Sequence, residues 1–250
     1  MIKQLRMTLA VLACAAQVAL AADIEFSAET YQKSPQGVEQ QGLIYVGRGQ
    51  MRTETAEGPQ QVIQIVDKKQ GKQWLLFPGK TSYSEAATPP LPDASQSAEP
   101  INPCGGVPGS HCEMLGEEDL SGRAATKWKM TVNRRGQTET ITQWIDKARG
   151  IPLRSEMSSG QRMEMRMVGP DNLAGRPVEK WEMVMWGANQ QTPQRSYQWY
   201  DQQLELVIRE ELPGGFVREL KNIRVGPQPG SLFQLPAGWK RVQGPSGGAQ

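Results

Sequence analysis

Residues 122–130 read GRAATKWKM, and residues 175–183 read GRPVEKWEM. Each stretch is followed by a second tryptophan motif, QWID at residues 143–146 and QWYD at residues 198–201. Two stretches with the same order of Gly-Arg, Trp, Met and Trp-x-Asp indicate one structural unit that occurs twice in the chain.

The spacing within the two copies is nearly constant. Gly122 and Gly175 are 53 residues apart, whereas Asp146 and Asp201 are 55 residues apart. We therefore expect a two-residue insertion in the turn between residues 186 and 192. The expected structural equivalents are Trp128 with Trp181 and Trp144 with Trp199.

An arginine stands eight residues after each of these aspartates, with a glutamate two positions further on. Residues two apart on a strand point to the same face. We interpret these side chains as members of cross-strand ion pairs on a solvated face rather than as acid–base groups. The pairs are Arg154 with Glu156, Arg209 with Glu211 and, earlier in the chain, Arg52 with Glu54.

Both copies, like residues 24–83 before them, show the alternation of apolar and polar residues that is typical of β-strands. Strands are expected at residues 61–67 and 73–77, and another is expected to start at residues 42–46 and continue through residues 51–54. Repeated units usually lie side by side in a common sheet. A long sheet that curls on itself exposes fewer unpaired backbone groups at its edge strands. We therefore predict a mostly β fold: a single curved antiparallel sheet that curls into a full or partial barrel, with few short helices.

Residues 85–112 lack a periodic pattern and contain five prolines between positions 89 and 103, which is typical of a long irregular loop. Residues 113–120, EMLGEEDL, are the one helix candidate, weakened by Gly116. The predicted organisation is a signal peptide at 1–21, a β-meander at 22–84, the proline-rich loop at 85–120, repeat units at 121–170 and 174–242 in one continuous domain with 22–84, and a flexible tail at 243–250.

Residues 1–21 have the features of a secretory signal. Lys3 and Arg6 precede an apolar run that ends in an A-x-A cleavage site at Ala21. The run is too short for a membrane-spanning helix, so we predict cleavage after Ala21 and a periplasmic mature chain. The alternative is a lipobox at residues 11–14, in which Cys14 becomes acylated; the apolar residues after Cys14 favour cleavage.

Cleavage changes the charge balance. The full chain has 28 basic residues, 26 acidic residues and one His, and removal of Lys3 and Arg6 leaves 26 basic residues. A neutral mature chain has no basic field for nucleic acid, and a mean hydropathy of −0.55 excludes a polytopic membrane protein. We predict no transmembrane segment after signal removal.

Enzyme signatures are absent from the sequence. A single histidine makes His-based triads and zinc sites hard to build, and there is no GxSxG, Walker A, HExxH, CxxC or GxGxxG motif. We predict a protein without catalytic residues, metal or cofactor, although a glycosidase-type pair of distant carboxylates stays open.

Two cysteines remain after cleavage, Cys104 and Cys112, in a loop rich in glycine and proline. An even pair in an exported protein indicates a disulfide. A metal or haem site that includes His111 is the alternative, but the spacing is neither CxxC nor CxxCH.

Methionines form a stripe in the repeat region. Met163, Met165 and Met167 alternate with charged residues on one strand, and Met183 lies two residues after Trp181 on another. We predict that these five side chains line a binding site for an apolar ligand, because the unbranched Met side chain adapts to different shapes. Ordinary core packing and a thioether site for Cu(I) stay open as alternatives.

The chain resembles the LolA/LolB-like superfamily of periplasmic lipoprotein carriers, in particular its uncharacterised branch. The resemblance covers most of residues 23–242. It is carried by GLIYV at 42–46, WLLFPGK at 74–80, the hairpin from QWID at 143–146 to GIPLRSE at 150–156, and SLFQLPAGW at 231–239.

This resemblance implies a half-open β-barrel whose hydrophobic concave face takes up acyl chains. The chain departs from these carriers in its long proline-rich loop, its duplicated second half and its few helices. We expect a non-enzymatic periplasmic binding protein, carrier-like, for an acyl chain or a lipidated polypeptide. The alternative is a structural or interaction protein of the cell envelope without a small ligand.

Overall fold

The computed structural model describes residues 24–57, 60–88, 102–104, 107, 109–134, 137–190 and 192–243. The predicted signal peptide, most of the proline-rich stretch between 89 and 108, and residues 244–250 of the predicted tail lie outside the described residues.

The described residues form sixteen β-strands and two 3₁₀ helices. The strands of the first half are β1 (Phe26–Lys33), β2 (Glu39–Gly47), β3 (Gln50–Glu57), β4 (Gln60–Asp67), β5 (Lys72–Phe77), β6 (Ser82–Ala87) and β7 (Ser110–Asp119). The second half contains β8 (Ala124–Arg134), β9 (Gln137–Asp146), β10 (Pro152–Met157), β11 (Arg162–Leu173), β12 (Arg176–Trp186), β13 (Gln194–Asp201), β14 (Leu206–Leu212), β15 (Phe216–Val225) and β16 (Lys240–Arg241). The 3₁₀ helices are η1 (Pro78–Lys80) and η3 (Gly230–Phe233).

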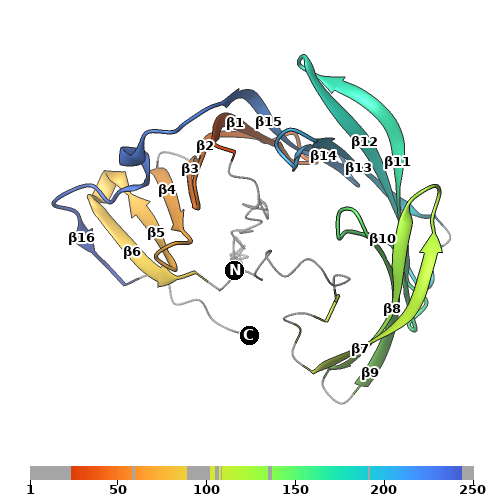
Figure 1. Ribbon diagram of the computed structural model, residues 1–250. Helices are drawn as coiled ribbons and strands as arrows, with labels where there is room; N and C mark the ends of the chain where they lie inside the picture. The colour runs from red at the N-terminus through yellow and green to blue at the C-terminus, as the bar shows by residue number, and fades with distance from the viewer. Residues whose placement is uncertain are drawn as a thin grey trace, which may run out of the picture.

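All sixteen strands belong to one curved sheet that does not close (Figure 1). Its order is β16-β6-β5-β4-β3-β2-β1-β15-β14-β13-β12-β11-β10-β9-β8-β7. Strand β1 pairs with both β2 and β15 and so joins the two halves of the chain. Apart from the short parallel strand β16, the pairings are antiparallel, and the predicted mostly β fold with one curved, incomplete barrel is confirmed.

The two sequence repeats have the same strand register. Trp128 on β8 lies opposite Gln143 on β9, and Trp181 on β12 lies opposite Gln198 on β13. Trp144 and Trp199 likewise face Lys127 and Lys180. The longer connection from Trp186 to Gln194 contains the expected insertion.

The turn that follows the Trp-x-Asp motif of each repeat has a third copy in the N-terminal part of the chain, at Asp67. The sequence did not reveal this copy. Each copy has a buried aspartate at the end of a strand, whose Oδ1 accepts a hydrogen bond from a backbone N–H in the following turn. The aspartates and their donors are Asp67 with Gln70, Asp146 with Ala148, and Asp201 with Leu204. A side chain at or just before the start of the preceding strand donates a hydrogen bond to each carboxylate: Gln50 to Asp67, Arg123 to Asp146 and Arg176 to Asp201.

Two sequence-based expectations are wrong. The helix expected at residues 113–120 is strand β7, paired with β8; Gly116, with φ +140°, lies at a bulge that hides the alternation of a strand. The strand expected to run through residues 42–54 is the hairpin β2–β3, because Gly49, with φ +71°, makes a tight turn. A positive φ is readily adopted only by glycine.

Three hydrophobic clusters hold successive parts of the sheet together. The first joins Ala125, Trp144 and Leu153 to Trp181 of the second repeat. The second uses the equivalent residues Val178, Trp199 and Ile208, packed against strands β1–β3. In the third cluster the packing partner is not another repeat but the C-terminal segment. Phe233 of η3 packs on Ile63, Ile65, Trp74 and Leu76.

Candidate functional site

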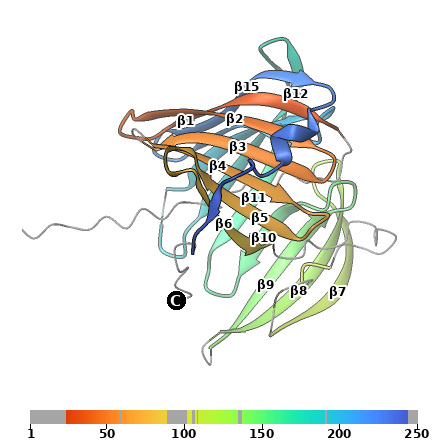
Figure 2. The same ribbon diagram turned by 90° about the vertical axis from the view of Figure 1, so that its left-hand side faces the viewer.

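The strand pairings identify the concave and convex faces of the sheet. Helix η3 lies on the outer, convex side of the curve (Figures 1 and 2), and Tyr45 packs against the same cluster as Phe233. Directly opposed residues on neighbouring strands point to the same face. Tyr45 on β2 is opposite Ser27 on β1, and Tyr31 shares the face of Ser27 because residues alternate along the strand. From Tyr31 the opposed pairs continue on the same face through Glu219, Arg209 and Trp199 to Lys180. Trp181, the next residue after Lys180, therefore points to the concave face.

The predicted methionine residues lie together on this concave face. Met163 is opposite Met185, Met165 is opposite Met183, and Met167 is opposite Trp181 across β11 and β12. We call these six residues the methionine stripe. Met167 is 41% exposed and Met185 42% exposed, so part of this apolar surface is open to a ligand.

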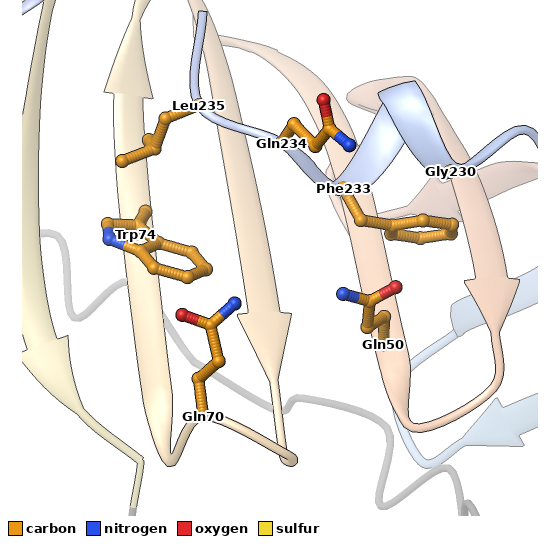
Figure 3. A pocket seen from close by; sticks show the side chains of 7 residues that line it. All are labelled: Gln50, Gln70, Trp74, Gly230, Phe233, Gln234 and Leu235. Atoms are coloured by element: carbon orange, nitrogen blue, oxygen red, sulfur yellow. The ribbon is translucent and has the colours of Figure 1, made fainter.

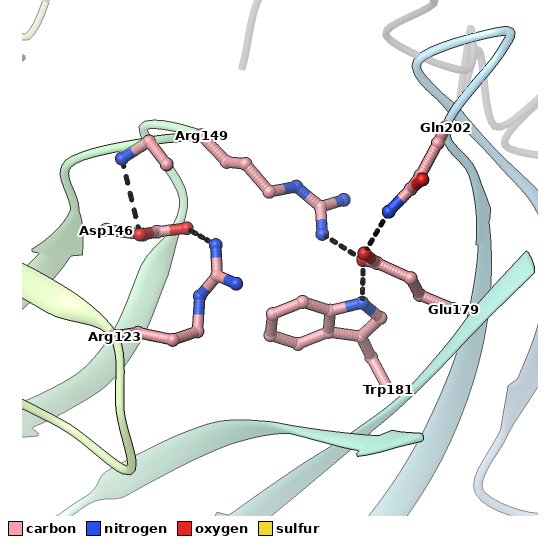
Figure 4. A network of polar contacts seen from close by, with 7 residues as sticks. Arg123, Asp146, Arg149, Glu179, Trp181 and Gln202 are labelled. Atoms are coloured by element: carbon pink, nitrogen blue, oxygen red, sulfur yellow. Dashed lines mark hydrogen bonds and ion pairs between the residues drawn. The ribbon is translucent and has the colours of Figure 1, made fainter. Parts of the chain in front are cut away.

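Trp181 differs from the other members of the stripe because its side chain is only 2% exposed. The guanidinium carbons of Arg123 and Arg149 lie 5.0 Å and 4.9 Å from the centre of its ring. Figure 4 shows both arginines next to the indole. A ligand on the stripe would therefore meet these guanidinium groups, and not the indole itself, at this end.

Glu179 organises the polar cluster around Trp181. Its Oε2 accepts hydrogen bonds from Trp181 Nε1 at 3.0 Å and from Arg149 Nη1 at 2.9 Å. Gln202 Nε2 donates to Oε1 (Figure 4). Arg123 pairs separately with the buried Asp146, so two arginines and two carboxylates balance each other at this end of the stripe.

The opposite end of the stripe opens into a hollow of about 290 Å³ near the turns that follow β10 and β12. Its lining combines thioether and amide side chains. Among the lining residues are Ser155, Met157, Met163, Met185, Gln190 and Gln194. The concave face thus offers an apolar strip that ends at this hollow on one side and at a charged cluster on the other.

The predicted disulfide is present: Cys104 and Cys112 are bonded, with Cα atoms 5.8 Å apart. Cys112 lies opposite Met130 on the edge strand pair β7–β8. The bond therefore fastens residue 104 to the edge of the sheet. Because both sulfur atoms are used in the disulfide, Cys104 and Cys112 cannot supply thiolate ligands for the alternative metal site with His111.

A second hollow, of about 410 Å³, lies beneath the C-terminal segment (Figure 3). Gln50 and Gln70 at its rim both donate to Oδ2 of Asp67, at 2.7 Å and 3.0 Å. The rings of Trp74 and Phe233 are buried in the third hydrophobic cluster. These side chains hold the fold together and leave no open aromatic surface for stacking.

The convex face carries the expected ion pairs, but they lie along single strands rather than across strands, and the face is not fully solvated, because the side chains of Arg52 and Glu54 are only 14% and 17% exposed. Arg52 with Glu54, Arg154 with Glu156 and Arg209 with Glu211 are paired along their strands. Arg209 also reaches Glu219 across strands at 2.6 Å. Trp144 and Trp199 each lie between a lysine and an arginine: Lys127 and Arg154, and Lys180 and Arg209.

Glu182 is a further buried carboxylate of this face. Burial raises the pKa of Glu182, but hydrogen bonds from Arg166, Arg195 and Tyr197 outweigh it and hold the pKa below its usual value. The three donors lie 2.8, 2.6 and 3.2 Å from the carboxylate oxygens. The group is therefore a structural anion between strands β11, β12 and β13.

Sequence reasoning missed the contact of Arg149 with Glu179. The two residues are 30 positions apart, on the β9–β10 turn and on β12. The repeat offered one signal: 55 residues after Arg149, the equivalent position in the second copy is Leu204. The first copy thus has a charged residue, Arg149, at the position that a buried leucine occupies in the second copy.

Among the residues that the structure describes, no helix is long and apolar enough to cross a membrane.

Comparisons with known proteins give a similarity of fold. No family profile matches the sequence, and no curated protein matches it.

Several solved structures are similar to the chain. One is a LolA superfamily protein from Nitrosomonas europaea, at 14% identity over 88% of this chain and 95% of that chain, with a TM-score of 0.36. Another is a putative outer membrane lipoprotein-sorting protein domain from Vibrio parahaemolyticus, at 11% identity over 87% and 95%, with a TM-score of 0.34. A third is an uncharacterized conserved protein from Thermus thermophilus, at 11% identity over 91% and 94%, with a TM-score of 0.34. The LolA-like resemblance expected from the sequence thus reappears among solved structures.

Proposed function

We propose that this chain is a non-enzymatic periplasmic binding protein, carrier-like, that takes an acyl chain or a lipidated polypeptide on the concave face of its sheet. The observation that carries the proposal is the methionine stripe, where Met167 and Met185 are exposed on the inner side of the curve. The disulfide between Cys104 and Cys112 supports an oxidising compartment, in line with the predicted signal peptide.

The chemistry of the stripe suits an acyl chain. Each methylene group removed from water contributes about 0.8 kcal/mol, so a chain can gain affinity without a reactive group. Methionine side chains repack around ligands of different shape. Release then requires only that the ligand leaves the open side of the sheet.

A titration with a fluorescent fatty acid tests this function. We expect saturable binding by the wild type and at least tenfold weaker binding by the double variant Met167→Glu/Met185→Glu, because two carboxylates would enter the apolar strip. Both positions are exposed, so the variant should keep its fold, which circular dichroism would verify.

The matched control is Glu164→Lys, a charge change on the same strand but on the opposite face. Its pair with Arg162 is exposed and 3.7 Å long, so it should alter neither stability nor binding. Absence of saturable wild-type binding, or equal affinity of the double variant, would contradict the proposal.

A second function, an envelope interaction protein without a small ligand, is favoured by one feature of the edge strand β7. This strand is ten residues long, forms one end of the sheet, and carries exposed Met114 and Leu115. A strand at the edge of a sheet can pair with another chain. A protein that binds no fatty acid but forms a stoichiometric complex through β7 would support this second function.

A further inference from the structure

The methionine stripe ends at two guanidinium groups. Met167 lies opposite Trp181, and both Arg123 and Arg149 lie over the Trp181 ring. Arg149 also lies 3.5 Å from the centre of the Tyr200 ring. An apolar chain on the stripe would therefore have its end next to these arginines.

Both arginines have more hydrogen-bond donors than acceptors among the described residues. A guanidinium group has five N–H donors. Arg149 makes one hydrogen bond to the described protein, from Nη1 to Glu179. Arg123 contacts Asp146, while its Nε is buried without a partner in the described part of the chain.

Glu179 does not depend on Arg149 alone. Its carboxylate also accepts hydrogen bonds from Trp181 Nε1 and from Gln202 Nε2. If Arg149 turned to another acceptor, Glu179 would keep two donors and remain satisfied. Arg149 can therefore leave Glu179 without removing all hydrogen bonds to that carboxylate, and a new pair with a ligand anion would offset the cost of breaking the ion pair.

The repeat shows that the turn does not need an arginine here. Leu204, the equivalent of Arg149 in the second copy, is buried in the second hydrophobic cluster. In both turns the side chain of the preceding aspartate accepts a hydrogen bond from a backbone N–H, which Ala148 donates to Asp146 and Leu204 donates to Asp201. The arginine at position 149 therefore requires an explanation other than the fold of its turn.

We propose that Arg149 binds the oxyanion head group, carboxylate or phosphate, of an amphiphile whose acyl chain lies on the methionine stripe. This inference rests on the proposed function and adds the class of head group. In the free protein Arg149 is paired with Glu179. On binding it turns to the oxyanion, which planar guanidinium groups recognise through two parallel hydrogen bonds, while Glu179 stays with Trp181 and Gln202.

The experiment compares palmitate with hexadecanol, which has the same chain length but no charge, in displacement of the fluorescent fatty acid. Arg149→Leu installs the residue of the second repeat and should bind palmitate at least tenfold more weakly, with a much smaller effect on hexadecanol. Glu179→Gln removes the competing charge but keeps a carbonyl acceptor, and should bind palmitate severalfold more tightly. A lysophosphatidylglycerol arm distinguishes a phosphate head group from a carboxylate.

The outcomes separate this inference from the proposed function. Equal changes for palmitate and hexadecanol in Arg149→Leu, or weaker palmitate binding by Glu179→Gln, would overturn the role of Arg149 and leave acyl-chain binding intact. Failure of the wild type to bind either compound would contradict both. Opposite shifts of the two variants, confined to the anionic ligands, would establish the inference, because a purely structural role would not give opposite signs.

Discussion

Glu182 shows at the scale of one residue how the convex face is stabilised. Its buried carboxylate holds Arg166, Arg195 and Tyr197, and Glu182→Gln should lower the free energy of unfolding at pH 7 by about 1–3 kcal/mol, as expected for hydrogen bonds to a charged group. The folded-state pKa of Glu182 is lowered, so this stability is present above the unfolded pKa and is lost as the pH falls through the folded pKa.

Urea unfolding of wild type and Glu182→Gln at pH 7 and near pH 3 measures this difference. The gap between the two proteins should shrink at the lower pH. Glu164→Gln, which removes an exposed pair, should change stability by less than about 0.5 kcal/mol at both values. A gap that stays constant with pH would show that Glu182 acts through packing and not through its charge.

Five residues of the methionine stripe could be assigned to one face from the sequence because alternation assigns a strand face directly, whereas the exposed Met185 was not among the predicted residues. The contacts of Arg123 and Arg149 with the Trp181 ring could not be predicted in this way. Arg123 lies just before β8 and Arg149 lies in the β9–β10 turn, both far from Trp181 in the chain. The contact between Arg149 and Glu179 depends on how the sheet bends between its repeats, and spacing within one strand contains no such information.

At the scale of elements, the C-terminal segment completes the N-terminal part of the sheet. Phe233→Ala should destabilise the protein by about 3–5 kcal/mol, the usual cost of removing a buried Phe side chain, because the ring packs on Ile65 and Trp74. A Cβ at Gly47 would lie 2.8 Å from Cε2 of the same ring. Gly47→Ala should therefore destabilise the wild type, and less so when Phe233 is already Ala.

A double-mutant cycle by thermal unfolding measures this coupling. Val242→Ala, at an exposed position after β16, serves as the control and should be nearly neutral. Additive effects of the Gly47 and Phe233 variants would contradict a direct contact between the segment and β2.

The strands of the two repeats were predictable, since matched tryptophans fixed their number and direction. The N-terminal copy was not, because Ile65 stands where Trp144 and Trp199 stand in the others. Only the buried aspartate of each turn is common to all three. Strand β7 was taken for a helix because four acidic residues and a bulged glycine obscure its alternation.

At the scale of the whole molecule, an open sheet leaves its inner face as a surface that can hold a ligand. The two ends of the sheet, β6 with β16 and β7, are far apart in the strand order. A closed small barrel fills its interior with side chains, whereas an incomplete one leaves a groove. We predict that an acyl chain occupies the concave methionine stripe.

Photocrosslinking with a palmitate that carries a diazirine near the end of its chain tests this claim most directly. After illumination and proteolysis, mass spectrometry should find the label on peptides of β11 and β12, at Met163, Met165, Met167, Met183 or Met185, and excess palmitate should abolish it. Label on the hollow beneath Phe233, or labelling that excess palmitate does not compete, would contradict binding on the concave face.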